Sequence, residues 1–337
     1  MELDALRGLA ALGVMEYHYT TWYAQIYGHS SEVLINFPKG KYGLELFFII
    51  SGFVIFMTLE KTKSSSDFLI GRFSRLFPAY WAAIFLTFFV VSITGLPGLS
   101  VKPYEALINL TMLQGFFNVP HVDNVYWTLE LELSFYIIMF ILYKFKLLKN
   151  IEKITMGWLL LLTLNIALRH YFGFQVDGRV ETLLLLNNAN VFIIGLMFYR
   201  IYKEGASISR YGIIVSSLLI FKLEYSGGGL KSFHSWAEVL IVAFFVILFQ
   251  LIMNGKLKFI CLRAFLFAGT ISYSLYLIHQ NIGYVIIRDL YKLNVNPNVS
   301  IFIAIVVSIT LASMITFLIE KPMMRFIKEK YYYSNLS

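Results

Sequence analysis

Long apolar stretches recur along the whole chain and are separated by short polar segments. A helix needs about 20 mainly apolar residues to cross a bilayer, whereas the strands of a membrane barrel alternate polar and apolar positions over about ten residues. The stretches here are continuous, so they predict membrane-spanning helices. Ten candidate spans follow from them: 5–27, 42–60, 76–95, 126–145, 154–171, 180–201, 211–224, 236–254, 268–288 and 299–320.

Two segments fit this scheme less regularly than the others. The seventh span, 211–224, is short and flanked by glycine, and 104–117 is a candidate for a surface or re-entrant helix instead of a span. No linker or internal repeat divides the chain. We therefore expect an all-α polytopic membrane protein with ten transmembrane helices, in which 1–330 form one membrane-embedded domain and 331–337 form a short cytoplasmic tail.

The basic residues of the loops predict an orientation for these spans. Of the 28 Lys and Arg residues, 18 fall in loops on one side of the scheme, nine fall on the other side, and Arg7 lies within the first span. Cytoplasmic loops carry the excess of Lys and Arg, so both termini are expected in the cytoplasm. The first span is expected to remain uncleaved, because no basic segment precedes it and Arg7 interrupts its apolar stretch.

Composition agrees with the membrane class and narrows the chemistry. Charged residues make up 14% of the chain, against about a quarter in soluble domains. The formal charge of +8 comes from basic residues in short loops, which is typical of a topology signal and not of a nucleic-acid surface. The single cysteine, Cys261, excludes an internal disulfide and a cysteine metal cluster, and no metal site is expected. Motifs of nucleotide hydrolysis and of zinc proteases are absent.

Ionisable side chains within spans are the main candidates for function, because each costs roughly 2.5–3.5 kcal/mol to insert. Eight such residues lie in or at the ends of the predicted spans: Arg7, Glu16, His18, Glu45, Glu130, Glu132, His279 and Glu320.

Arg7 and His18 lie on the same face of the first predicted helix. Their separation of 11 residues corresponds to three helical turns plus about 20°. Histidine is suited to accept a proton near neutral pH, which makes His18 a candidate base. The alternatives are an interhelical hydrogen bond for His18 and an arginine that extends to the membrane surface for Arg7.

Three of the five glutamates in this set are less easily assigned. Glu16 is about 200° from His18 around the helix, so a structural or surface-directed role is favoured for it. Glu130 and Glu132 are also about 200° apart, and a regular helix can direct only one of them into a given cavity. Their spacing does not indicate which one.

Two further pairs lie three residues apart on predicted helices. Tyr276 and His279 share a face, and either a polar cluster that lines a cavity or a simple packing contact would explain them. Arg72 and Arg75 precede Pro78 at the predicted cytoplasmic side. Two guanidinium groups on one face suit the recognition of phosphate, although basic residues at this position also serve as ordinary topology signals.

Six segments that contain these residues resemble, in order, the motifs of the acyltransferase-3 family of bacterial multi-pass membrane acyltransferases, which includes polysaccharide O-acetyltransferases. The matching segments are Leu3-Asp4-Ala5-Leu6-Arg7-Gly8-Leu9-Ala10-Ala11-Leu12 with His18, Phe47 to Phe53, Arg72 to Trp81, Trp127 to Glu132 with Phe135 and Tyr136, Ser272 to His279, and Glu320-Lys321-Pro322. Two positions depart from the family pattern, because Glu45 stands where aspartate is frequent and Glu16 where an apolar residue is usual.

The resemblance implies a function for the chain. It implies transfer of an acyl group, most commonly acetyl, from cytoplasmic acyl-CoA to a hydroxyl of a glycan or lipid-linked sugar at the bacterial cytoplasmic membrane. Acetyl-CoA is then the co-substrate, and membrane lipids surround the protein. The acceptor and any protein partner stay open.

The resemblance also implies roles for particular residues. His18 is expected to be essential, as a base or, less directly, as an acyl carrier, and Glu132 is expected to be the family's glutamate. Arg72 and Arg75 are expected to hold the phosphates of coenzyme A. Arg7 is expected to hold a donor phosphate or to polarise the path of transfer, and Glu132 or His279 to orient His18 or position the acceptor. The expected substrate-binding residues are Glu45, Trp127, Tyr276 and His279.

Two other classes of function remain as alternatives. Buried charges that line a cavity between helices are also typical of a transporter or flippase of a polar or acylated solute. A structural membrane protein would use the same polar side chains as contacts between helices. Turnover of acyl-CoA separates the enzyme from both.

Overall fold

The structure of the chain is a computed structural model that describes residues 1–224 and 233–334. Within these ranges the elements are helical, and no β-strand occurs. The α-helices are α1 (Glu2–Tyr17), α2 (Tyr23–Ile26), α3 (Gly43–Lys61), α4 (Ser65–Thr94), α5 (Pro103–Asn109), α6 (Trp127–Lys144), α7 (Ile151–Phe172), α8 (Gly178–Leu184), α9 (Ala189–Glu204), α10 (Ile208–Leu223), α11 (Trp236–Met253), α12 (Arg263–Lys292), α13 (Pro297–Met314) and α14 (Lys321–Ser334).

Short irregular helices complete the set. Two of them are π-helices, η1 (His18–Trp22) and η8 (Ile315–Glu320). The first follows α1 directly, and the second joins α13 to α14. Residues 331–334 of the predicted tail continue α14, and residues 335–337 lie outside the described residues.

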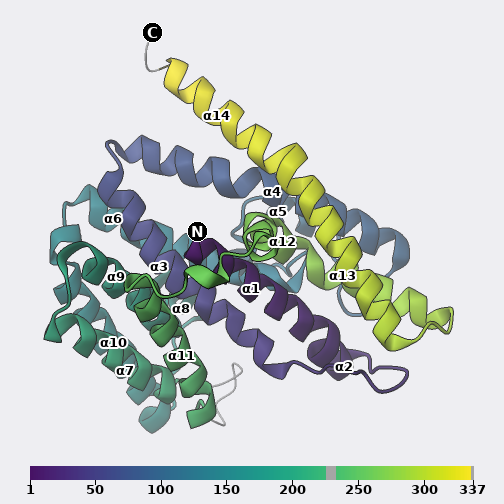
Figure 1. Cartoon of the computed structure of the whole chain (residues 1–337), viewed down its shortest axis with the longest axis horizontal. Coiled ribbons are helices and arrows are strands. Elements are labelled where there is room, and N and C mark those ends of the chain that lie inside the picture. The colour runs from purple at the N-terminus through teal and green to yellow at the C-terminus, as the bar shows by residue number, and fades with distance from the viewer. Residues whose placement is uncertain (225–232, 335–337) are drawn as a thin grey trace.

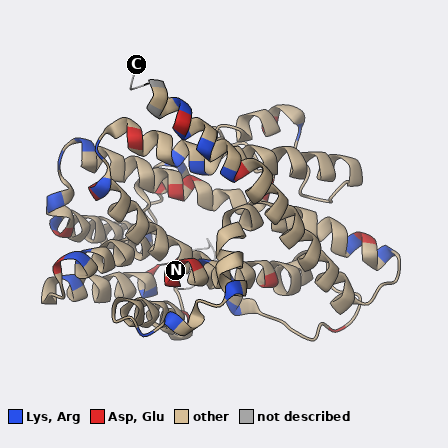
Figure 2. Ribbon diagram, turned by 45° about the horizontal axis from the view of Figure 1, so that its top comes forward, with Lys and Arg blue, Asp and Glu red and all other residues tan. Residues whose placement is uncertain are grey.

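Each of the ten predicted spans overlaps helical structure, although 180–201 is divided between α8 and α9, and seven helical stretches are long and apolar enough to cross a membrane. These are Pro38–Lys61, Ser65–Thr94, Asn124–Lys144, Leu148–Phe172, Gly178–Glu204, Trp236–Met253 and Pro297–Tyr331. Helices α1, α10 and α12 are not among them, because α10 has 16 residues and the other two contain polar residues. Figure 2 shows long helical stretches without charge, while Lys and Arg gather near helix ends and along α14.

The polar helices α1 and α12 lie at the centre of the molecule (Figure 1). Helix α12 packs on α1, on α4 and on α13, and 17 of its 30 residues are buried. Gly8 and Gly269 allow α1 and α12 to approach closely, since a Cβ atom at Gly8 would lie 2.5 Å from the backbone nitrogen of Gly269. Small residues that let two backbones approach are typical of helix contacts in membranes.

Two groups of helices flank this centre. Helices α6 to α11 form one group, and α3 joins it through a contact with α9. Helices α4, α13 and α14 lie on the other side, where α14 packs along α4 (Figure 1). Residues from α1, α3, α4, α6, α12 and α14 can therefore meet around one space in the middle of the bundle.

The segment 104–117 does not form a span. It folds as α5, a turn and the 3₁₀-helix η3 (Gln114–Phe117), followed by η4 (Asn124–Tyr126). Buried polar side chains hold the connection between η3 and η4 against the bundle, because Asp123 accepts a hydrogen bond of 3.0 Å from the backbone N–H of Asn281 in α12. The first turn of α6 is thereby fixed beside α12.

Candidate functional site

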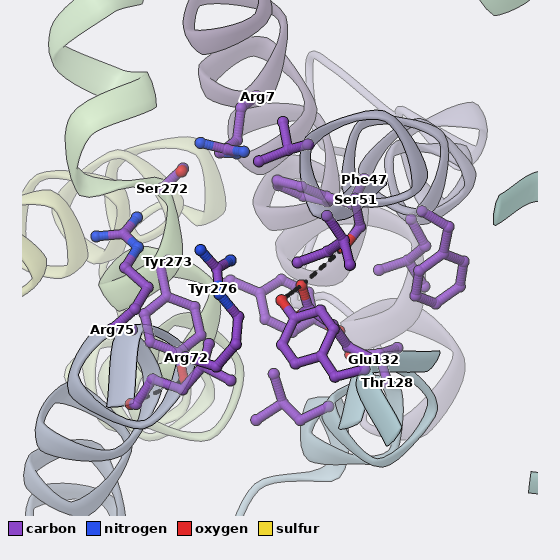
Figure 3. A pocket seen from close by; sticks show the side chains of 18 of the residues that line it. Arg7, Phe47, Ser51, Arg72, Arg75, Thr128, Glu132, Ser272, Tyr273 and Tyr276 are labelled. Atoms are coloured by element: carbon purple, nitrogen blue, oxygen red, sulfur yellow. Dashed lines mark hydrogen bonds between the residues drawn. The ribbon is translucent and has the colours of Figure 1, made fainter. Parts of the chain in front are cut away.

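A cavity of about 260 Å³ lies between α1, α3, α4, α6, α12 and α14 (Figure 3). Along α3 its lining extends from Leu44 to Ile55, and 11 residues of helix rise by about 16 Å. Along α6 it extends from Thr128 to Tyr136. The cavity therefore runs along the helices for several turns and is not a shallow surface hollow.

One end of the cavity is strongly basic. Arg7 of α1, Arg72 and Arg75 of α4 and Lys328 of α14 all line it. Arg7, Arg72 and Arg75 come close together in Figure 3, although they come from two different helices. Glu132 is the acidic residue of the lining, so positive charge is in excess among the lining residues. An anion would be attracted to this end.

The arginines differ in how their guanidinium groups are held. Arg75 forms an ion pair with Glu320, whose side chain is fully buried at the end of η8, and Glu320 also accepts a hydrogen bond of 3.0 Å from Ser274. Arg72 lies over the rings of Phe68 and Tyr136, and its Nε is buried without a hydrogen-bond partner. The Arg72 group therefore retains a free donor at the cavity.

Glu132 lies on the cavity, whereas Glu130 does not. Glu132 accepts hydrogen bonds from Ser51 at 3.0 Å and from Tyr136 (Figure 3). Glu130 points away and accepts a bond of 2.6 Å from the backbone N–H of Gly115. The structure thus places at the cavity the same glutamate that the family resemblance implied, and gives the other one a contact with η3.

The other end of the cavity is mainly apolar and is closed by Tyr276 of α12. The Tyr276 hydroxyl lies 2.7 Å from the hydroxyl of Thr128 and donates to the carbonyl of Val125 at 3.0 Å. Its ring packs against Phe47, with 6.0 Å between ring centroids. The same ring lies 5.7 Å from the ring of His279, one turn further along α12. Tyr276 therefore separates the cavity from a buried histidine.

His279 and His18 form a hydrogen-bonded pair. The Nε2 of His279 lies 3.0 Å from the Nδ1 of His18. On its other side, the Nδ1 of His279 lies 2.9 Å from the carbonyl of Tyr276, and the Nδ1 of His18 lies 2.9 Å from the carbonyl of Val14. His18 is partly buried, whereas His279 is 1% exposed.

These contacts fix the tautomers of the two neutral rings. A carbonyl oxygen only accepts, so the Nδ1 of His279 carries its hydrogen and the Nε2 of His279 is an acceptor. The Nδ1 of His18 must then carry the hydrogen that faces both this acceptor and the Val14 carbonyl. The Nε2 of His18 is left with a lone pair, which is the arrangement that a general base requires. The π-helix η1 begins at His18, and such departures from the α-helix are frequent at functional sites.

The structure divides the predicted site residues between three places. Arg7, Arg72, Arg75, Glu132 and Tyr276 line the basic cavity. The histidine pair lies behind Tyr276 and is not part of the described lining. Glu45 and Trp127 line a second cavity of about 370 Å³, so they are not brought together with the other expected substrate-binding residues.

Some residues that line the two cavities were not predicted from the sequence. The second cavity also contains Asn190 and Glu224, and Glu224 could have been noticed as a carboxylate at the end of the predicted span 211–224. Lys328 reaches the first cavity from α14, which the ten-span scheme placed outside the bundle. Glu16 contributes a backbone carbonyl to Thr20, and nothing in the described contacts explains its carboxylate.

Comparison with known proteins places the chain in a family. A family model described as an acyltransferase domain, that of acyltransferase-3, matches residues 2–318. ORF330 of Acidianus two-tailed virus, which is named as a presumed acetyltransferase, is 23% identical over 282 residues that cover 81% of this chain and 80% of the viral protein. Nodulation protein 10 of Rhizobium leguminosarum bv. viciae is 27% identical over 154 residues, which cover 40% of this chain and 41% of that protein. No solved structure matches. The family match covers nearly the whole chain and confirms the resemblance, so the protein belongs to the acyltransferase-3 family of acyl-transferring enzymes.

Proposed function

We propose that the protein transfers an acyl group, in the first place acetyl, from cytoplasmic acyl-CoA to a hydroxyl of a cell-surface or exported glycan at the bacterial cytoplasmic membrane. The observation that carries this proposal is the histidine pair. It leaves the Nε2 of His18 as a free lone pair, and His279 adjoins the closed end of a cavity whose other end is basic.

The two ends of the cavity suit the two ends of an acyl-CoA. The phosphates of coenzyme A would bind Arg72, Arg75 and Lys328, where guanidinium groups can form paired hydrogen bonds to phosphate oxygens. The narrow arm that carries the thioester would extend along α3 towards the closed end, where Phe47 packs against Tyr276. A volume of about 260 Å³ admits this arm and leaves the nucleotide part at the mouth.

His18 would act as the base in a single displacement. Its Nε2 takes the proton of the acceptor hydroxyl while the hydroxyl oxygen attacks the thioester carbonyl carbon. The carbon–sulfur bond then breaks, and the proton returns to the thiolate of coenzyme A. His279 would stabilise the charged His18 ring through its acceptor nitrogen.

The test uses the full-length protein in proteoliposomes with acetyl-CoA and the envelope glycans of cells that express it. His18→Ala should lower kcat by about 10² to 10⁴ and leave the binding of acetyl-CoA unchanged, because it removes a base and no donor contact. Arg72→Ala should raise the KM for acetyl-CoA about tenfold or more, as expected for one charged hydrogen bond to phosphate.

Arg263→Ala is the matched control for the arginine. Arg263 begins α12 on the same predicted side but does not line the cavity. The KM of this variant for acetyl-CoA should therefore equal that of the unsubstituted protein. If His18→Ala is folded and inserted in the membrane and still turns over at the wild-type rate, His18 is not the base.

A further inference from the structure

The second cavity, of about 370 Å³, lies at the opposite end of the bundle from Arg7, Arg72 and Arg75. It is lined by residues at helix ends: Glu45 in the first turn of α3, Trp127 at the start of α6, Asn190 at the start of α9, and Glu224 directly after α10. The volume lies within the range of about 300–1,000 Å³ that is common for ligand pockets. Loop charges predict that this end of the bundle faces away from the cytoplasm.

Two carboxylate oxygens in this cavity have no hydrogen-bond partner. Glu224 is 4% exposed, and its Oε2 accepts a bond of 3.1 Å from the side-chain amide of Asn190, but its Oε1 is buried without a donor. The Oε2 of Glu45 is buried without a donor as well. Buried acceptors that lack donors are rare in native proteins, because the loss of hydration is not compensated. A ligand with O–H groups would supply the missing donors.

The charge of the lining argues against an acidic ligand. Arg169 also lines the cavity, but its guanidinium forms an ion pair with Glu181. Among the described lining residues, the carboxylates of Glu45 and Glu224 therefore have no ion pair with a cation. A phosphate or carboxylate placed here would be poorly compensated, because the arginine of the described lining, Arg169, already pairs with Glu181.

Aromatic and amide groups add the remaining features of a sugar site. Trp127 is 44% exposed and offers an apolar face on which the C–H face of a sugar ring can pack. The side chains of Asn187 and Asn190 can both donate and accept hydrogen bonds, as sugar hydroxyls do.

The two cavities adjoin the same helical turns. Leu44 and Thr128 line the basic cavity, and the next residue of α3 and the preceding residue of α6, Glu45 and Trp127, line the second one. A molecule in the second cavity is thus close to the apolar end of the first, where Tyr276 and the histidine pair lie. We propose that the second cavity binds the acceptor and that the acceptor unit held there is an uncharged sugar. This inference rests on the proposed acyl transfer.

The test measures acetyl transfer from labelled acetyl-CoA to the envelope glycans of cells that express the full-length protein, with the variant proteins in proteoliposomes. Glu224→Gln keeps an acceptor for Asn190 and replaces the unpartnered carboxyl oxygen by an amide NH₂ group, and Trp127→Ala removes the ring. Both should raise the KM for the glycan about tenfold while the affinity for acetyl-CoA stays unchanged. Fragmentation mass spectrometry should locate the acetyl group on a neutral sugar residue.

Asn165→Ala is the matched control, because Asn165 is a buried amide on α7 that does not line the cavity. It should leave the KM for the glycan unchanged. Unchanged KM values in both Glu224→Gln and Trp127→Ala, or an acetyl group on a uronic or other acidic residue, would overturn the inference. Absence of any acetyl transfer by the unsubstituted protein would instead refute the proposed function, so the two failures are distinct.

Discussion

His279 accepts a hydrogen bond from His18 through its Nε2 and donates one to the carbonyl of Tyr276 through its Nδ1. Its proposed role is to keep, together with the Val14 carbonyl, the hydrogen of His18 on Nδ1, so that Nε2 is the basic atom. His279→Ala should therefore reduce kcat about 10²-fold or more without a change in the KM for acetyl-CoA. His279→Gln restores an acceptor oxygen near His18 and should recover part of the activity.

A readout besides activity checks this assignment. Nitrogen NMR of labelled histidine distinguishes protonated from unprotonated ring nitrogens, and His18 should show a protonated Nδ1 in the unsubstituted protein. In His279→Ala the Val14 carbonyl alone accepts from this nitrogen, so the share of the other tautomer should rise. A purely structural role for His279 would leave the His18 tautomer unchanged in the folded variant.

The roles of Glu130 and Glu132 could be predicted from the sequence only in part. Helical spacing predicted that Glu130 and Glu132 point in different directions. It could not predict which of them lies at the cavity, because that depends on the neighbour that each side chain contacts. The deciding contacts are with Ser51 of α3, 81 residues before Glu132, and with Gly115 of η3, 15 residues before Glu130. For Tyr276 and His279, spacing left a cavity and a packing contact open, and the structure contains both: the Tyr276 ring lines the cavity, and its carbonyl bonds to His279.

Among the elements, the contact between α1 and α12 sets the position of the whole site. Arg7 and His18 come from α1 and η1, whereas Ser272, Tyr276 and His279 come from α12. A Cβ atom at Gly8 would overlap the backbone of α12, so Gly8→Ala should force the helices apart. Overpacking of this kind costs about 1–3 kcal/mol, and both the melting temperature and kcat should fall.

Gly157→Ala provides the comparison for this variant. Gly157 lies within α7, and a Cβ atom there would meet nothing within 4 Å. Alanine in a helix is favoured over glycine by about 0.5–1 kcal/mol, so this variant should melt at the same or a higher temperature. Equal melting temperatures for Gly8→Ala and the unsubstituted protein would mean that the two helices are not closely packed at this point.

Hydropathy alone could not identify α1 and α12 as the central elements. The polar residues that lower their hydropathy, such as Arg7 and His279, are tolerated because other helices surround them and supply partners. The sequence indicated the existence of both helices through the length of their apolar stretches. Their depth in the bundle depends on contacts between distant segments, which a single sequence without aligned relatives does not reveal.

At the scale of the whole molecule, the proposed donor site requires one orientation. The basic cavity must open to the cytoplasm, where acyl-CoA is found, and the excess of Lys and Arg in the loops predicts the same orientation. The single cysteine offers a direct measurement, because Cys261 lies in the loop between α11 and α12 that is predicted to be cytoplasmic, and it is partly exposed. A membrane-impermeant maleimide should label it only after the cells are permeabilised.

Glu32→Cys in a Cys261→Ser background reports on the opposite side. Glu32 is exposed in the loop between α2 and α3, which is predicted to face outward, so this variant should be labelled in intact cells. Labelling of Cys261 in intact cells would mean that the protein has the opposite orientation. The arginine cavity would then face outward, away from its donor, and Glu45, Trp127 and Glu224 would lie on the cytoplasmic side. Donor and acceptor sites would then have to exchange roles. Since the arginine of the second cavity already pairs with Glu181, that cavity does not suit the phosphates of coenzyme A, and the proposed assignment of donor and acceptor sites would be wrong.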